Sequence, residues 1–164
     1  MDNQEFYTVR GYEIMGKKNH RLSHSMEDYL EMIYRHSLEE GYVRINTLAE
    51  ALHVQPPSAT KMVQKLGKMG LLRYEKYGVV LLTEEGERLG EFLLKRHQII
   101  ETFLKIIGVG ENLLVNVELI EHNVTTGALE KIETLNNFFA EHPEILEKYE
   151  RYRASQINNK QATK

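Results

Sequence analysis

Two carboxylates and an imidazole share one helical face in the short segment VELIEH. Glu118, Glu121 and His122 stand at positions i, i+3 and i+4, so a helix through the segment would project all three to the same side. Val117, Leu119 and Ile120 supply apolar surface elsewhere on that helix, which indicates that it packs against the rest of the protein. The polar face is therefore a candidate for metal binding.

Three more residues of the same chemistry occur in two other segments that we expect to be helical. Asp28 and Glu31 lie three positions apart in SMEDYLEMIY, and His97 lies between LLKR and QII. Carboxylates and imidazoles without sulfur suit a hard to borderline divalent ion, of which Mn²⁺ and Fe²⁺ fit best and Zn²⁺ needs fewer ligands. Four carboxylates are generous for one ion, which favours two neighbouring ions that share bridging carboxylates. The predicted ligands are Asp28, Glu31, His97, Glu118, Glu121 and His122.

Each of these residues also has an ordinary structural interpretation. Asp28 could belong to a capping box that opens with Ser25, and Glu31 could be a solvated charge. His97 could be a core histidine bonded to a backbone carbonyl, and the two glutamates of VELIEH could lie at the favourable N-terminal end of a helix dipole. Taken singly, every residue fits this interpretation better, and spacing alone does not show that three segments meet.

Length, charge and composition limit the class of protein. The 164 residues suit one domain or two small ones that share a core. The chain has no cysteine, no run approaching a membrane span and no signal-like N-terminus, so we expect a cytoplasmic protein without disulfides. The net charge of −3 argues against a protein that coats nucleic acid. Between His53 and Tyr77, however, five basic residues face one acidic residue, which indicates a local basic patch.

The apolar pattern predicts a winged helix–turn–helix. A helix runs from Ser25 to Gly41, and TLAEALHV forms a second helix with a capping-box pattern at Thr47 and Glu50. A third helix begins near Pro57, because proline is tolerated only at a helix start. LLRYEKYGVVLLT then predicts two strands that turn at a Tyr-Gly pair.

The second helix of such a pair enters the DNA major groove, which makes double-stranded DNA the expected partner. Its outward side chains are small hydroxyls, an amide that can contact adenine and three cations that can contact phosphates. The alternative is a solvated helix with ordinary surface lysines, but the helix before it and the basic hairpin after it favour DNA binding. The predicted DNA-binding residues are Ser58, Thr60, Lys61, Gln64, Lys65 and Lys68.

Thr83 is predicted to cap a long helix that ends at Gly108. After it come VELIEHN, read as the first part of a helix, then a helix near GALEKIETLNNFF and a last helix opened by Pro143.

Five segments, in order and with near-continuous spacing, resemble the DtxR family of metal-dependent repressors. They are SMEDYLEMIY, LAEALHVQPPSATKMVQKL, YEKYGVVLLTEEGERLG, RHQIIETFLKIIGV and VELIEH. The likeness runs from about Ser25 to His122 and continues weakly through the last helices. It implies a metal-activated, homodimeric transcriptional repressor of metal-uptake genes, not an enzyme, and it places the family's metal ligands on the six residues named above.

Two positions resemble the short-chain, manganese-responsive branch of that family. The iron-responsive branch has methionine in place of Asp28 and cysteine in place of Glu118, and its longer members carry an additional SH3-like domain. The resemblance therefore implies Mn²⁺ as the cofactor, with two ions per subunit, while Fe²⁺, Zn²⁺ or other divalent ions could bind in vitro. The family pattern also implies that Glu31 and Glu118 are shared between the two ions or lie between their sites. Asn123, the Pro56-Pro57 pair and the long N-terminal arm depart from the family pattern.

We therefore predict a mainly α-helical protein with a winged helix–turn–helix DNA-binding domain (residues 25–83) and a connecting helix with an all-helical dimerisation domain (residues 84–164). An arm of uncertain order (residues 1–24) precedes them. Two other classes stay open. One is a metal-independent winged-helix regulator whose acidic cluster is merely solvated. The other is a carboxylate-bridged dinuclear enzyme, which would use paired Glu-x-x-His motifs, whereas Leu119 stands three positions before His122.

Overall fold

Helix α2 (His24–Glu40) opens the part of the chain that the computed structural model describes, residues 22–162, with the side chains of residues 76 and 157–162 excepted. It ends at Gly41, whose φ of 76° is the left-handed conformation that glycine adopts at low cost. Leu22 is 3% exposed and packs in the core. The folded part therefore includes the last residues of the expected arm, and residues 1–21 of that arm lie outside the described residues.

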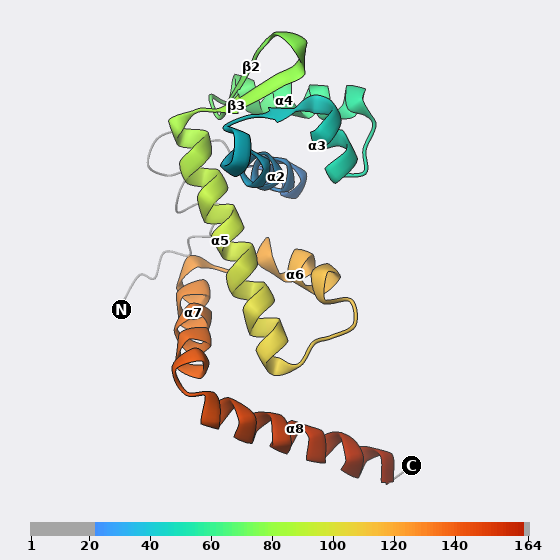
Figure 1. Ribbon diagram of the computed structural model, residues 1–164, viewed down its shortest axis with the longest axis vertical. Helices are drawn as coiled ribbons and strands as arrows, with labels where there is room; N and C mark the ends of the chain where they lie inside the picture. The colour runs from blue at the N-terminus through green and yellow to red at the C-terminus, as the bar shows by residue number, and fades with distance from the viewer. Residues whose placement is uncertain (1–21, 163–164) are drawn as a thin grey trace, which may run out of the picture.

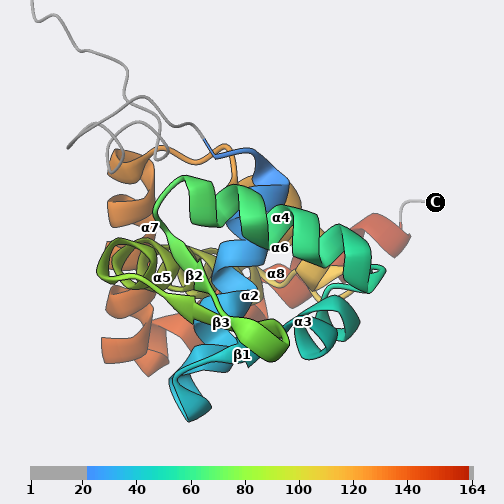
Figure 2. The same cartoon turned by 90° about the horizontal axis from the view of Figure 1, so that it is seen from above.

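A helix–turn–helix and a small antiparallel sheet complete the first half of the molecule (Figure 2). Helices α3 (Ile45–Ala51) and α4 (Pro56–Lys68) are followed by strands β2 (Leu72–Tyr74) and β3 (Val79–Leu82). Strand β1 (Val43–Arg44) pairs with the other side of β3, which gives the sheet order β1-β3-β2. The predicted winged helix–turn–helix is confirmed. Strand β1 was not predicted, because two residues carry no alternating pattern.

The predicted capping box at Thr47 and Glu50 is wrong, and so is the alternative interpretation of Asp28 as part of a capping box. The N-cap residue of α3 is Arg44, so Thr47 lies inside the helix and cannot cap it. The N-cap residue of α2 is Ser23, which makes no side-chain hydrogen bond, and Asp28 lies in the second turn. The carboxylate of Asp28 is therefore free of a capping role and can face another part of the protein.

Helix α5 (Glu84–Ile107) joins the two halves of the molecule (Figure 1). The Thr83 hydroxyl oxygen accepts a hydrogen bond from the Gly86 amide, and Gly108 ends the helix at φ 88°, so both predicted ends are confirmed. The first part of α5 packs against α2, where Leu93 belongs to the core of the winged half. Its later turns bury Ile100 and Leu104 in a second core.

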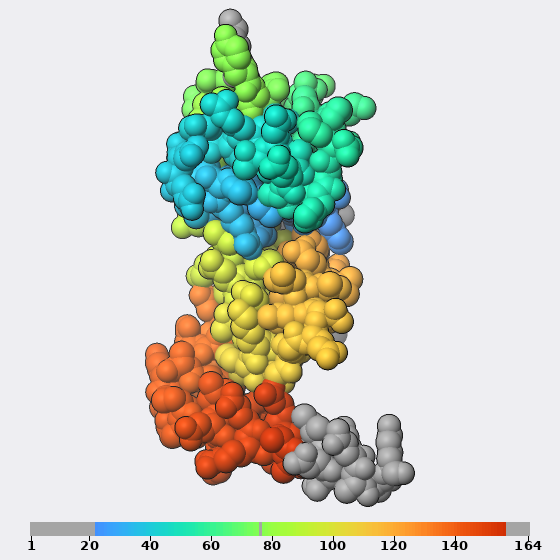
Figure 3. Space-filling view, turned by 45° about the vertical axis from the view of Figure 1, so that its right-hand side comes forward, coloured from blue at the N-terminus to red at the C-terminus, as the bar shows by residue number. Residues whose placement is uncertain are grey.

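The second half consists of α6 (Leu113–Glu121), α7 (Thr126–Glu141) and α8 (Pro143–Ala162). Helix α6 begins four residues before the segment that we read as the first part of the helix. Figure 3 shows an elongated molecule with the winged half at one end and α8 at the other. In residues 22–162, no helix has the length and apolar character required to cross a membrane.

Gly86 in the first turn of α5 provides a stability test. A Cβ added at this glycine would collide with the backbone carbonyl oxygen of Leu71, which cannot move away as a flexible side chain could. We expect Gly86→Ala to lower the free energy of unfolding by about 1–3 kcal/mol in urea titrations. Gly127→Ala in α7, where an added Cβ meets nothing within 4 Å, should instead raise it by up to about 1 kcal/mol. Equal effects of the two substitutions would contradict the close contact of α5 with the sheet.

Candidate metal centre

Three helices meet where the two halves of the molecule join, and each contributes acidic or histidine side chains. Helix α2 belongs to the winged half, α5 connects the halves, and α6 belongs to the second half (Figure 1). Residues separated by up to 95 positions in sequence come into hydrogen-bonding distance here. The structure brings together all six predicted metal ligands: Asp28, Glu31, His97, Glu118, Glu121 and His122.

The ring of His97 on α5 faces three carboxylates. Its Nδ1 atom lies 3.0 Å from Glu121 Oε2, 3.7 Å from Glu31 Oε1 and 3.9 Å from Glu118 Oε1. His97 Nδ1 and Glu121 Oε2 are buried, and within the described residues the hydrogen-bond geometry leaves both atoms unsatisfied although they lie 3.0 Å apart. The Nδ1 atom of His97 therefore does not make the backbone-carbonyl hydrogen bond of an ordinary core histidine. A cation between the two atoms would satisfy both, so the residues fit a bound metal ion.

The ring of His122 forms the second group. Its Nε2 atom lies 3.0 Å from Asp28 Oδ1, 3.7 Å from Glu121 Oε1 and 3.9 Å from Glu118 Oε2. His122 follows the last residue of α6 and keeps helical dihedral angles, so it stays on the face that carries Glu118 and Glu121. This face lies at the C-terminal end of the helix, not at the N-terminal end that the alternative interpretation required. The helix dipole there disfavours carboxylates and favours a cation.

Glu118 and Glu121 stand between the two imidazoles. Each of these carboxylates has one oxygen on the side of His97 and the other on the side of His122. This is the arrangement that two neighbouring ions with bridging carboxylates require. We had predicted that the two shared carboxylates would be Glu118 and Glu31. The contacts of Glu31 described in the structure lie on the His97 side alone, and Glu121 takes the second shared position.

A buried ion pair behind His122 escaped the sequence analysis. Glu27 Oε2 lies 2.7 Å from His122 Nδ1 and accepts a hydrogen bond of 2.9 Å from Arg96 Nη2. Glu27 is 3% exposed and Arg96 1% exposed. Because an ionised carboxylate can only accept, the Nδ1–H of His122 donates to Glu27, and the Nε2 edge turns toward Asp28. The sequence signal for this pair was a charged residue on the apolar face of each helix, Glu27 on α2 and Arg96 on α5, and we did not consider it.

The carboxylates shift the pKa values of both histidines. Burial lowers the pKa of His122, but contacts with Asp28, Glu118 and Glu27 outweigh burial and raise this pKa to about 11. The Glu121 carboxylate raises the pKa of His97 more than burial lowers it. For Glu31, burial and the charge of Glu121 raise the pKa, against the opposing effects of His97 and Arg35. Without a metal ion, protons on the histidines partly compensate the buried negative charge.

The expected DNA-binding residues form the outer face of α4. Ala59, Val63 and Leu66 are fully buried, which turns the opposite side of the helix outward. Thr60 is half-buried, and its hydroxyl donates to the Pro56 carbonyl at 2.9 Å, so the side chain can offer DNA only the lone pairs of that hydroxyl and its methyl group. The remaining five side chains are exposed: Ser58, Lys61, Gln64, Lys65 and Lys68.

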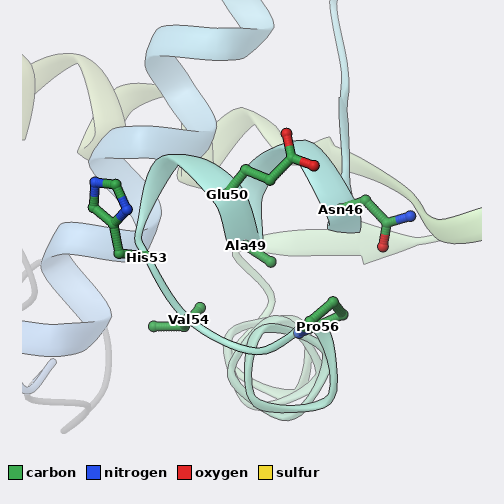
Figure 4. Close-up of a pocket in the computed structure, with 6 residues that line it drawn as sticks. All are labelled: Asn46, Ala49, Glu50, His53, Val54 and Pro56. Atoms are coloured by element: carbon green, nitrogen blue, oxygen red, sulfur yellow. The ribbon is translucent and has the colours of Figure 1, made fainter.

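The turn of the hairpin also presents residues that we had not singled out as contacts. Tyr77 is 91% exposed and has a φ of 63°, and Tyr74 is 44% exposed. A separate hollow lies between α3 and the start of α4, lined by Asn46, Ala49, Glu50, His53, Val54 and Pro56 (Figure 4). This hollow is in the helix–turn–helix and contains none of the residues of the metal cluster.

A winged helix–turn–helix joined to a helical domain through a carboxylate and histidine cluster defines a metal-dependent DNA-binding regulator. Comparison of the sequence with models of known protein families supports the same class. The model for the iron-dependent repressor N-terminal DNA-binding domain matches residues 21–80, and that for the iron-dependent repressor metal-binding and dimerisation domain matches residues 83–150. The chain belongs to the iron-dependent repressor family, which confirms the resemblance to DtxR-type repressors. It is a metal-activated transcriptional repressor and not an enzyme.

Individual relatives agree with this assignment. The HTH-type transcriptional regulator MntR of Lysinibacillus sphaericus (strain C3-41) is 47% identical over 127 residues, covering 77% of this chain and 91% of the relative. The solved structure of the manganese regulator SloR has 30% identity and a TM-score of 0.61, covering 69% of this chain and 54% of that one. A manganese-dependent transcriptional repressor in complex with manganese has 29% identity and a TM-score of 0.59, covering 69% and 53%. The chain thus spans about half the length of these two solved structures.

The pKa of His122 gives a test in the metal-free protein. A folded-state pKa of about 11, against an ordinary value of 6.5, means that the ring stays protonated through neutral pH. Its stabilising contribution is fully present below about pH 6.5 and is lost as the pH rises toward 11. NMR titration of the ring should show no midpoint below pH 9.

Two variants serve as controls for this titration. Glu27→Gln and Asp28→Asn each remove one of the negative charges in contact with His122, so each should lower its pKa. A His122 midpoint near 6.5 in the unmodified protein would show that the ring does not contact these carboxylates in solution.

Proposed function

We propose that the protein is a homodimeric repressor of metal-uptake genes that two Mn²⁺ ions per subunit activate for operator binding. The observation that carries this proposal is the position of Glu118 and Glu121 between the two imidazoles, with one oxygen of each carboxylate toward either ring. One ion would take oxygen and nitrogen ligands from Asp28, Glu118, Glu121 and His122. The other would take them from Glu31, His97, Glu118 and Glu121.

The donor set supports manganese as the physiological ion. The six side chains offer carboxylate oxygen and imidazole nitrogen, and the chain has no cysteine that could provide a thiolate. Such donors suit Mn²⁺ and leave selection against softer ions to the number and geometry of ligands. The relatives named for manganese support the same choice. Fe²⁺, Zn²⁺ and other divalent ions would bind the same side chains in vitro.

Metal binding would control DNA binding by fixing α2 against α6. Asp28 and Glu31 belong to the winged half, whereas Glu118, Glu121 and His122 belong to the second half. Ions held by both sets would favour one relative orientation of the two halves, and therefore one spacing of the two α4 helices in the dimer. By linkage, DNA must tighten metal binding by the same factor as metal tightens DNA binding.

We assign DNA binding to residues 25–83 and dimerisation to residues 84–164. In the DNA-binding part, Lys61, Lys65 and Lys68 would contact phosphates, while Gln64 and Ser58 would face base edges. The tyrosines of the hairpin would add contacts beside the major groove. The regulator would act in the cytoplasm, where operator DNA and imported metal ions meet.

An operator-binding titration tests the proposal as a whole. Fluorescence anisotropy with operator DNA at fixed salt would be measured with Mn²⁺, Fe²⁺, Zn²⁺ or chelator. We expect tight binding with Mn²⁺ and loss of specific binding with chelator. Full operator binding in chelator would contradict metal activation and would support the metal-independent regulator instead.

Glu118→Ala tests the bridging role. Because this carboxylate serves both groups of ligands, its removal should weaken the binding of both Mn²⁺ ions by about 10-fold or more. Equilibrium dialysis would give the stoichiometry and affinity, and circular dichroism would check the fold. Glu130→Ala, which removes an exposed carboxylate of α7, is the matched control and should leave both affinities unchanged. Unaltered binding by the Glu118 variant would refute the site.

Gln64→Ala and Lys65→Ala separate base contacts from phosphate contacts. With Mn²⁺ present, the loss of Gln64 should cost about 1–3 kcal/mol on the operator and little on random DNA, because an amide pairs with a specific base edge. The loss of Lys65 should weaken both duplexes alike and reduce the salt slope by about one unit. Anisotropy titrations on both duplexes at several salt concentrations measure these effects. Equal losses on both duplexes for Gln64→Ala would remove it from the base-contacting residues.

A further inference from the structure

Arg35 lies next to the metal cluster, one turn after Glu31 on α2, and none of the roles assigned so far uses it. Its Nε and Nη2 atoms both donate to Glu31 Oε1, at 3.0 and 2.6 Å. That same oxygen is the one that lies 3.7 Å from His97 Nδ1. The guanidinium therefore binds the carboxylate oxygen that faces the His97 group of ligands.

The charge of Arg35 reaches beyond its direct partner. It lowers the pKa values of Glu31, His97 and Glu118, in each case as one of the smaller contributions. No such contribution from Arg35 is among the leading causes of the pKa shift of His122. Arg35 thus acts as a positive charge on the His97 side of the cluster, where the second ion would bind.

We propose that Arg35 competes with the metal ion of the His97 group for Glu31, so that this ion binds more weakly than the ion of the His122 group. This inference rests on the proposed two-ion function and adds an order of filling to it. A divalent ion that approaches Glu31 meets a fixed cation already bound to Oε1, and it must displace the guanidinium or share the carboxylate with it. The side chain of Arg35 is 38% exposed, so solvent is available to the guanidinium when it leaves.

The His122 group has its own arginine, but that arginine does not compete. Arg96 is 1% exposed and binds Glu27, which lies behind the ring and is not among the six ligands. Its guanidinium faces Nδ1 of His122, opposite the Nε2 edge on which an ion would bind. Mn²⁺ should therefore bind first in the His122 group and in the His97 group only at a higher Mn²⁺ concentration. Arg35 would thus raise the Mn²⁺ concentration at which the repressor is activated.

Arg35→Met tests the competition, because methionine keeps an unbranched chain and removes the charge. Mn²⁺ binding to the full-length, DNA-free protein would be followed by electron paramagnetic resonance, which counts free ions and detects the coupling of two neighbouring ions. We expect the weaker of the two Mn²⁺ affinities to tighten by about tenfold and the tighter one to change by less than about twofold. The coupled signal should then appear at fewer equivalents of Mn²⁺.

Two further variants make the result specific. Arg35→Lys retains the positive charge and should stay close to the unmodified protein. Arg88→Met removes an arginine of α5 that pairs with Glu85 on the surface, and it should change neither affinity. A weaker second affinity in Arg35→Met would show that Arg35 positions Glu31 for the ion, and unchanged affinities would show that it has no role; either outcome overturns the proposal. Failure of the unmodified protein to bind Mn²⁺ would instead refute the two-ion function.

Discussion

Concentration of excess negative charge, part of it buried, between two halves of one chain is the constraint on which the structure depends. Five carboxylates, those of Glu27, Asp28, Glu31, Glu118 and Glu121, lie at this junction with two guanidinium groups, those of Arg35 and Arg96. The prospective ligand atoms of each group lie within 4.8 Å of one another. At such separations two like charges repel by about 3–4 kcal/mol at an effective dielectric constant of about 20. Protons on the two histidines or bound metal ions must therefore hold the junction together.

A proton and a divalent ion would compensate the negative charge of the junction in different ways. A proton on His122 provides a positive charge next to Asp28, whereas a divalent ion would draw Asp28, Glu118 and Glu121 toward one point. The buried Glu27–Arg96 pair stays in place in either case, because neither residue is a prospective ligand. It fixes the ring of His122 in the orientation that exposes Nε2, so the site is prepared for an ion before the ion arrives. A bound ion would add ties between α2 and α6 that the proton cannot provide.

Sequence patterns predicted the elements and the six clustered residues well, for identifiable physical reasons. The helices had long apolar stripes and clear ends, such as Thr83 before α5 and Gly108 after it. The clustering of ligands was indicated by chemistry and family resemblance together, because local spacing cannot bring residues 95 positions apart into contact. The errors came from short-range signals. The capping pattern at Thr47 was overruled by the packing of Ile45 in the core, and α6 began earlier because Leu113 packs against the second core.

The residues that escaped prediction were those whose role exists only in three dimensions. Glu27 and Arg96 look like ordinary charges in sequence, and only the fold shows that they are buried against each other. In sequence, Arg35 looks like a residue that stabilises a helix by pairing with Glu31 four positions earlier. In the structure, the same carboxylate oxygen also faces His97, so the pair lies within the group of prospective metal ligands. Glu121, and not Glu31, lies between the imidazoles together with Glu118. This arrangement depends on the direction of the side chains, which helical spacing alone does not determine.

Anomalous X-ray diffraction at the manganese edge, on crystals of the Mn²⁺-loaded protein, would locate the bound ions. We expect two anomalous peaks between α2, α5 and α6. One should be coordinated by His122 and Asp28, the other by His97 and Glu31, and Glu118 and Glu121 should contact both. A single peak, or peaks that do not touch α2, would contradict the claim that two ions join the halves of the molecule.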